Sequence, residues 1–130
     1  MGKFTHSLIY DERDLYMSPF DILLLGHLIG DYLFQTSWMA INKANNWKAL
    51  ITHSAVYTLA VASVGWMGFG GLSVWAILLV FITHVFLDQR TFVAWWVRTI
   101  MTSKGKESAW LNIMVDQTFH LIVLALVLQI

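Results

Sequence analysis

The amino-acid sequence predicts an all-α, polytopic membrane protein with four transmembrane helices in an antiparallel bundle. Hydrophobic residues make up 58% of the 130-residue chain and charged residues only 12%, well below the roughly 25% charge of soluble globular domains. Four apolar stretches, separated by polar breaks, approach the length of about 20 residues that a helix needs to cross a bilayer. We therefore expect an N-terminal extension, residues 1–19, and a transmembrane domain, residues 20–130.

Composition also argues against several classes of function. The formal net charge is zero, whereas nucleic-acid binding needs a clustered basic face, so no nucleic-acid partner is expected. Cysteine is absent, which excludes disulfides and thiolate chemistry. The extension lacks the apolar core and cleavage site of a signal peptide, so we expect it to stay attached, with His6 as an ordinary surface residue.

The first expected span covers residues 20–40. The sequence SPFD at positions 18–21 predicts its start, because it supplies a capping hydroxyl, a proline at the first helical position and an acid in the first turn. Gly26 and Gly30 form a small-xxx-small pattern, which favours the close approach of a neighbouring helix.

Three further spans are expected at residues 49–67, 73–90 and 109–129, and the Gly-rich sequence GWMGFGG separates the first two of these. The longer connection before the last span, RTFVAWWVRTIMTSKGKES, mixes aromatic with basic residues. This composition fits an amphipathic helix in the membrane interface, and it fits a disordered basic loop equally well.

Tryptophan and basic residues predict the limits and the orientation of the spans. The tryptophan ring prefers the headgroup region, and every tryptophan of the chain falls near an expected helix end. The first and third connections carry six of the eight Lys and Arg residues, so the positive-inside rule places these connections in the cytoplasm. We therefore expect an integral protein of the inner membrane with both termini on the non-cytoplasmic side.

Polar side chains recur inside the spans at a spacing of four residues, which places both members of a pair on one helix face. An ionisable group in a span costs at least about 2.5–3.5 kcal/mol at the bilayer centre, so such groups indicate function. In the expected orientation they lie towards the cytoplasmic ends, where antiparallel helices can close around one site. The pairs, one in each span, are His27 and Asp31, His53 and Tyr57, His84 and Asp88, and Asp116 and His120.

We interpret these residues as a metal site, because imidazoles and carboxylates bind Zn, Mn or Fe and a divalent cation offsets the repulsion between carboxylates. The donors are too many for one tetrahedral ion, so they fit a two-metal centre or one metal with supporting carboxylate–histidine pairs. Gln35, Tyr57 and Gln117 would support the ligands or contact a substrate. The candidate metal ligands are His27, Asp31, His53, His84, Asp88, Asp116 and His120.

Other interpretations of the same residues stay open. A network of His–Asp hydrogen bonds, with carboxylates paired to Arg90, would hold the helices together without a metal. The histidines would also serve as axial ligands of a tetrapyrrole. A proton or ion path is disfavoured, because the spans are nearly all apolar between Tyr57 and the outer interface. Asp88 is close to an interface, and we expect solvent to reach it.

The four spans also carry family motifs: HLIGDYLFQTSWMAINK in the first, LITHSAVYT in the second, THVFLD in the third and DQTFH in the fourth. With these motifs in this order, the chain from Phe20 onward resembles a family of small bacterial and phage membrane proteins catalogued as a domain of unknown function. It is also similar in style to membrane-bound families named as metal-dependent hydrolases. The resemblance implies motif positions at His27, Asp31, Gln35, Lys43, His53, His84, Asp88, Asp116, Gln117 and His120.

Two functions fit these observations, and both place the chain in a lipid bilayer. The first is a membrane metallohydrolase, in which a metal activates water and an Asp or His acts as general base on an amphipathic substrate near the cytoplasmic leaflet. The second is a non-catalytic subunit of a larger membrane complex. Its aromatic faces would dock other membrane subunits, and its histidines would bind a tetrapyrrole or a structural ion.

Overall fold

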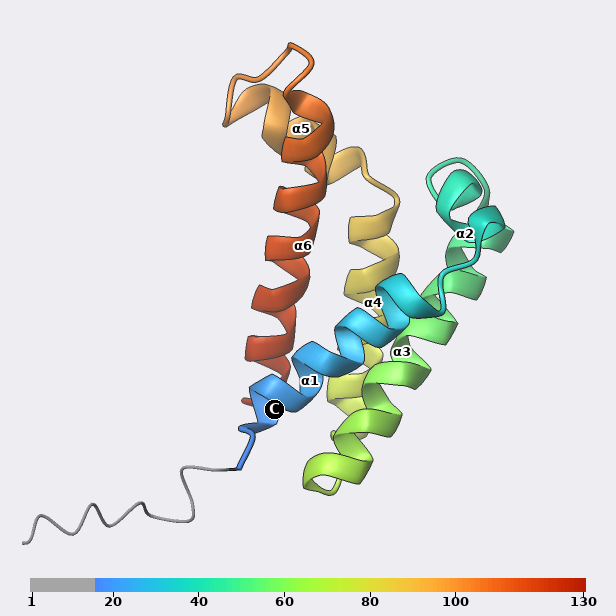
Figure 1. Ribbon diagram of the computed structural model, residues 1–130, viewed down its shortest axis with the longest axis vertical. Helices are drawn as coiled ribbons and strands as arrows, with labels where there is room; N and C mark the ends of the chain where they lie inside the picture. The colour runs from blue at the N-terminus through green and yellow to red at the C-terminus, as the bar shows by residue number, and fades with distance from the viewer. Residues whose placement is uncertain (1–15) are drawn as a thin grey trace, which may run out of the picture.

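The computed structural model describes residues 16–130, so His6 and most of the extension lie outside the described residues. The described chain is helical, with no strand in these residues, which confirms the all-α prediction. Neighbouring long helices contact one another in a closed order, α1 with α3, α3 with α4, α4 with α6, and α6 with α1 (Figure 1). These helices are α1 (Pro19–Leu28), α3 (Trp47–Phe69), α4 (Val74–Asp88) and α6 (Ser108–Val127).

The first expected span, residues 20–40, is not one helix. α1 continues into a π-helical turn, η2 (Ile29–Leu33), and the helix then stops before α2 (Ser37–Asn42) begins. The Thr36 side chain caps α2 by accepting a hydrogen bond from the amide of Met39. The prediction of one unbroken span was wrong because it included the polar residues Gln35 and Thr36 at the break, and the apolar residues before them give no signal of the π-helical turn.

The third expected span, residues 73–90, is also shorter than predicted. α4 ends at Asp88, and α5 (Thr91–Thr99) follows after a bend of 59°. Arg90 lies at the bend with a φ of 70°, a left-handed conformation that few residues other than glycine adopt. The start of the basic connection is therefore helical, and its position at a membrane interface stays a prediction.

Two helices, α3 and α6, are long and apolar enough to cross a membrane. α4 and α5 provide a third candidate if the bent pair counts as one span. α1 has 10 residues and η2 has five, fewer than the roughly 20 residues of a complete crossing. The structure thus supports two or three spans, and the predicted four unbroken spans are not confirmed.

Local signals at the helix ends behave as their chemistry predicts. The Ser18 hydroxyl accepts a hydrogen bond from the amide of Asp21, and the Asp21 carboxylate accepts one from the amide of Ser18. This reciprocal capping box confirms the predicted start of α1. At the C-terminal end of α3, the longest of the described helices, Gly70 adopts a φ of 91° and ends the helix.

The connection between α5 and α6 is held by Glu107. Its carboxylate accepts hydrogen bonds from the Ser103 hydroxyl at 2.8 Å and from the Gly105 amide at 3.1 Å. Hydrogen bonds from backbone amides, its own first, and from the Ser103 hydroxyl lower the pKa of the Glu107 carboxyl below its usual value. These bonds fix the direction in which the chain enters α6.

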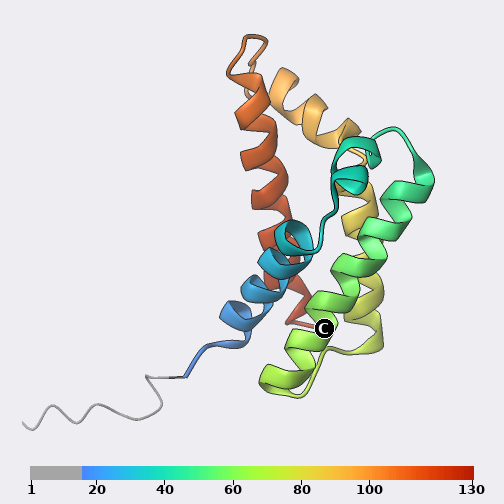
Figure 2. The ribbon, with the colours of Figure 1, turned by 45° about the vertical axis from the view of Figure 1, so that its right-hand side comes forward.

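α1 and η2 pack against α3 with their backbones close together (Figure 2). A Cβ added at Gly26 would lie 3.1 Å from Val61 Cα, and one added at Gly30 would lie 3.0 Å from Tyr57 Cα. This contact confirms the packing predicted from the small-xxx-small pattern. It also fixes the distance between η2 and α3, which both contribute side chains to the interior.

We predict that Gly30→Val destabilises the protein by about 1–3 kcal/mol, because the added side chain has no space against Tyr57. Thermal unfolding followed by circular dichroism in detergent micelles measures the effect. Ala55→Val provides a matched control, since Ala55 is exposed on α3. Equal midpoints for the two variants would show that the backbones are not in close contact at Gly30.

Candidate metal centre

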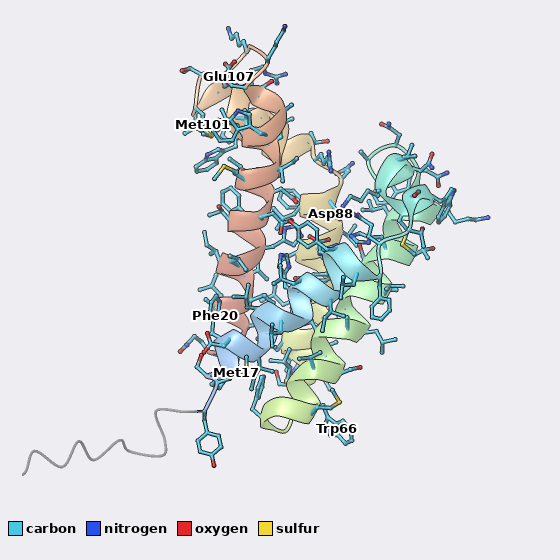
Figure 3. All side chains as sticks on the ribbon, viewed as in Figure 1. Met17, Phe20, Trp66, Asp88, Met101 and Glu107 are labelled. Carbon is cyan, nitrogen blue, oxygen red and sulfur yellow. The ribbon has the colours of Figure 1, made fainter. Side chains whose placement is uncertain are left out.

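The residues predicted as metal ligands are buried together in the interior between the long helices (Figure 3). None of them is more than 8% exposed. The expectation that solvent reaches Asp88 was wrong, because its exposure is only 1%. The buried set comprises His27, Asp31, His53, His84, Asp88, Asp116 and His120.

Four of these residues bring their ligand atoms to one point, from η2, α3 and α4. His53 Nε2 lies 3.0 Å from Asp31 Oδ1 and 2.9 Å from Asp88 Oδ2. His84 Nε2 lies 3.1 Å from Asp88 Oδ2 and 3.9 Å from Asp31 Oδ1. Ligand atoms about 2.0–2.1 Å from a tetrahedral zinc ion are about 3.3–3.4 Å apart. The observed spacing therefore fits a single divalent ion.

Hydrogen bonds of His120 and His84 indicate which nitrogen of each ring carries a proton. His120 Nδ1 lies 2.7 Å from the backbone oxygen of Asp116, which can only accept, so this nitrogen carries a proton. In a neutral His120 ring, Nε2 is then an acceptor, and His84 Nδ1 donates to it at 3.0 Å. In a neutral His84, Nε2 is then a lone pair beside Asp88, and it has no hydrogen-bond partner among residues 16–130. A cation between them would remove this repulsion.

Lys43 is a site residue that the spacing of polar pairs did not reveal. It follows α2, and its Nζ lies 2.8 Å from Asp88 Oδ2, with the Lys43 side chain only 6% exposed. The sequence placed it in a cytoplasmic connection, and only the family motif included it among the functional positions. The proposed partner Arg90 forms no ion pair with a carboxylate of residues 16–130.

A second group of three potential ligands consists of Asp31, Asp116 and His120. The Gln117 amide donates to Asp31 Oδ2 at 2.9 Å and to Asp116 Oδ2 at 3.2 Å. His120 Nδ1 lies 2.7 Å from the Asp116 backbone oxygen. The first group brings four potential ligands together, against three in the second, and is therefore the better candidate metal site.

His27 belongs to neither group, although it was predicted as a ligand. Because Gln117 uses its amide nitrogen for the carboxylates, its oxygen accepts a hydrogen bond from His27 Nε2 at 2.7 Å. His27 Nδ1 then accepts from the Tyr57 hydroxyl at 2.9 Å. Both ring nitrogens are occupied, so His27 positions Gln117 and Tyr57. This assignment of tautomer follows from the hydrogen-bond network.

The remaining polar predictions lie around the same interior. Tyr57 stacks on the His84 ring with centroids 3.8 Å apart, which fixes the orientation of that imidazole. Gln35 lines the pocket beside Asp31, and its side-chain oxygen is buried without a hydrogen-bond partner among the described residues. Gln35 and Tyr57 thus lie beside the candidate ligands, and their supporting role stays a prediction.

The packing of the imidazoles leaves little room for a tetrapyrrole. The rings of His53 and His84 have centroids 4.9 Å apart, and those of His84 and His120 are 4.7 Å apart. A macrocycle bound to one of these rings would have to separate the others and break their hydrogen bonds. A small ion fits the same interior without such rearrangement.

Comparison with known proteins identifies the family. Residues 20–130, the segment expected to form the membrane domain, match the family model described as Protein of unknown function (DUF3307). The chain belongs to this family. No curated protein and no solved structure matches it. The expected likeness of this DUF3307 member to membrane-bound metal-dependent hydrolases has no support from these comparisons, so its chemistry has to be inferred from the site.

We predict that Lys43→Met lowers the free energy of unfolding by about 3–5 kcal/mol, because it leaves the buried Asp88 carboxylate without its nearest cation. Denaturation in detergent micelles measures the loss. Lys48→Met is the control, since Lys48 is exposed at the start of α3 and its loss should cost no more than about 0.5 kcal/mol. Similar losses in both variants would contradict the buried ion pair.

Proposed function

We propose that this DUF3307 member is an integral membrane protein that binds a divalent metal through Asp31, His53, His84 and Asp88, and acts as a metal-dependent hydrolase. The observation that carries the proposal is the convergence of these four ligand atoms in a buried interior, where His84 Nε2 lies 3.1 Å from Asp88 Oδ2 and has no hydrogen-bond partner among the described residues. Zn, Mn and Fe all accept this combination of imidazole and carboxylate ligands.

The outer surface supports a location in the membrane. Large apolar side chains are exposed along the helices, including Leu59 at 68%, Ile82 at 61% and Leu126 at 57%. Soluble proteins rarely expose continuous apolar patches of this kind, whereas lipid-facing helices require them. We infer that α3, α6 and the bent pair α4 and α5 cross the bilayer, with α1 and η2 entering it beside them.

The arrangement of the connections supports the proposed orientation. α2 and the connection from α5 to α6 lie at one end of the molecule, and the α3–α4 turn and the C-terminus lie at the other (Figure 1). The first end carries Lys48, Arg98, Lys104 and Lys106, whereas the Gly-rich turn has no basic residue. By the positive-inside rule we place the first end on the cytoplasmic side of an inner membrane.

The residues around the site are suited to hydrolysis. A bound divalent ion lowers the pKa of water and polarises an ester or amide. Asp116 lines the adjoining pocket, and within the described part of the chain its Oδ1 has no hydrogen-bond partner, so it is placed to accept a proton from water. Gln117 holds the other oxygen of this carboxylate and therefore fixes its orientation.

A hydrogen-bond network without a metal is an alternative arrangement of the same buried atoms. An additional proton on His120 would let its Nε2 donate to Asp88 Oδ1, which lies 3.3 Å away. In that case the interior is a structural His–Asp network and the chain has no metal chemistry. Metal content distinguishes the two arrangements directly.

We predict that the purified protein retains about one divalent ion per chain, that His53→Gln loses it, and that His27→Gln keeps it at saturating metal. The two histidines are equally buried, but only His53 contributes an atom to the four-ligand group. The substitution His27→Gln is expected to weaken the affinity for the metal by about 10–100-fold, as substitutions of supporting residues do. Elemental analysis by mass spectrometry measures the content.

The proposal fails if the wild-type chain remains free of metal after incubation with Zn, Mn and Fe, or if His27→Gln and His53→Gln lose metal equally. An absorbing pigment or a co-purifying membrane subunit in place of the metal would favour the accessory-subunit function.

We also predict that chelation lowers the thermal midpoint and that readding metal restores it. Binding to the folded state alone stabilises a protein by about 2.7 kcal/mol when the free metal is 100 times its dissociation constant. The same titration on His53→Gln should produce no shift. A shift of equal size in that variant would place the metal elsewhere in the chain.

A further inference from the structure

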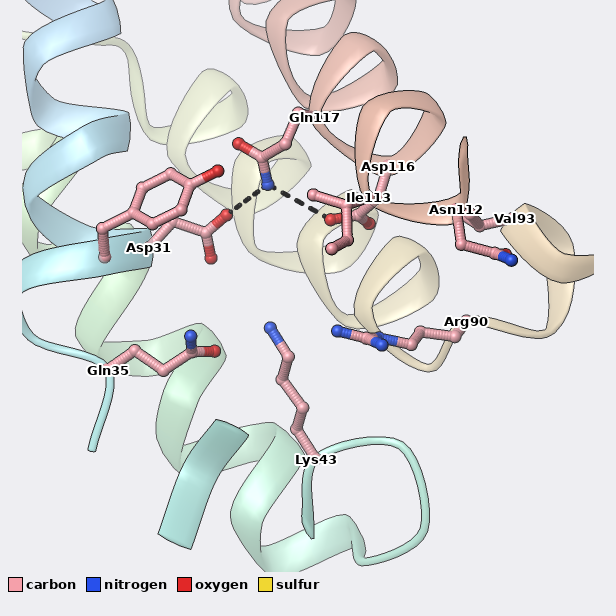
Figure 4. Close-up of a pocket in the computed structure, with 10 residues that line it drawn as sticks. Asp31, Gln35, Lys43, Arg90, Val93, Asn112, Ile113, Asp116 and Gln117 are labelled. Carbon is pink, nitrogen blue, oxygen red and sulfur yellow. Dashed lines mark hydrogen bonds between the residues drawn. The ribbon is translucent and has the colours of Figure 1, made fainter. Parts of the chain in front are cut away.

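A pocket of about 170 Å³ opens beside the proposed metal ligands. Asp31, Asp116 and Gln117 form one wall, and Lys43 and Arg90 extend towards them from the opposite side (Figure 4). The pocket thus places cationic side chains across an open space from the proposed catalytic carboxylate. We infer that it binds the phosphoryl group of a lipid phosphodiester, a substrate class that rests on the proposed hydrolase function.

Arg90 is the cation best placed to bind an anion. Its side chain is exposed, lines the pocket, and forms no ion pair with a carboxylate of residues 16–130. Residues other than glycine rarely adopt its left-handed backbone conformation, and such strain persists where the surrounding structure imposes it. Here it forms the bend that turns the guanidinium towards the pocket (Figure 4). A guanidinium matches two phosphate oxygens at once.

The charges around the pocket favour an anion once a metal is bound. Asp31, Asp88 and Asp116 provide three carboxylates, whereas Lys43 and Arg90 provide two cations. With the histidines neutral, these five groups carry one negative charge in excess without a metal, and a divalent ion leaves one positive charge in excess. A phosphodiester carries one negative charge and restores neutrality. Unpaired charge in an apolar interior is costly, so this balance favours the complex.

The mouth of the pocket favours a lipid over a small phosphoester in water. Tyr32 of η2 and Ile113 of α6 line it and are 53% and 55% exposed. Both lie on helices whose outer surfaces face lipid in the proposed orientation. An acyl chain can therefore leave the pocket along these side chains while the phosphate stays between Arg90 and the carboxylate wall. Arg90 lies between α4 and α5, at the start of the basic connection that leads to α6.

Hydrolysis of such an ester requires water alone as co-reactant. The oxygen of water forms a bond to phosphorus, one phosphorus–oxygen ester bond breaks, and the released alcohol oxygen receives a proton. Asp116 is placed to take the proton from water and return it to the leaving oxygen. Arg90 and Lys43 hold the phosphoryl oxygens during this exchange.

Calorimetric titration of the metal-loaded chain in nonionic detergent tests the inference. Dihexanoyl phosphatidylglycerol and dimethyl phosphate carry the same singly charged phosphodiester, with and without acyl chains. We expect the lipid to bind at least about tenfold more tightly than dimethyl phosphate, because only the lipid buries methylene groups at the mouth. Arg90→Gln should weaken the affinity for the lipid by about tenfold or more.

Arg98→Gln is the matched control, because Arg98 is an exposed cation on α5 that does not line this pocket. Equal lipid affinity in the wild type and in Arg90→Gln would overturn the inference. Equal affinity for the two probes would overturn the lipid assignment and indicate a water-soluble phosphodiester. Metal content is measured on the same samples. A chain that binds no metal contradicts the hydrolase proposal. A metal-loaded chain whose lipid affinity does not change in Arg90→Gln contradicts this inference alone.

Discussion

The buried carboxylate of Asp88 is the constraint on which the rest of the interior depends. It lies in an apolar interior with 1% exposure, and Lys43, His53, His84 and His120 all place a nitrogen within 3.3 Å of its oxygens. A carboxylate in such surroundings is stable only with cations or hydrogen-bond donors around it. The break between η2 and α2 lets Lys43 supply one of these cations, and α4 ends at Asp88, just before the bend at Arg90.

Asp31 links this centre to an outer network. One of its oxygens faces His53, and the other accepts a hydrogen bond from Gln117, which is itself fixed by His27. The contact of Gly30 with Tyr57 sets the separation of the elements that carry these residues. Packing, hydrogen bonding and the proposed metal chemistry therefore depend on the same few contacts, and a change in one should affect the others.

The sequence allowed the polar interior to be predicted because its spacing of four residues is a property of helices that needs no tertiary information. The capping box at Ser18 and the close packing at Gly26 and Gly30 were predictable for the same reason. The role of Lys43 was not predictable, because a lysine that follows an apolar stretch is typical of a solvent-exposed loop. Its burial depends on the break after η2, which two polar residues, Gln35 and Thr36, were not enough to predict.

The separation of His27 from the proposed ligands also required the structure. In sequence it is paired with Asp31 as His84 is with Asp88, and the two pairs have equal spacing. In space, the hydrogen bonds to Tyr57 and Gln117 occupy both of its nitrogens, whereas His84 retains one unpartnered nitrogen. Helix spacing identifies which face a residue occupies, but only the neighbouring helices determine what its side chain contacts.

X-ray absorption spectroscopy at the metal edge of the loaded protein tests the central claim most directly. Coordination by Asp31, His53, His84 and Asp88 predicts nitrogen and oxygen neighbours at about 2.0–2.2 Å for zinc, with the multiple-scattering signature of two imidazoles. A spectrum with no imidazole contribution, or with a shell of water oxygens only, would contradict a metal centre formed by these residues.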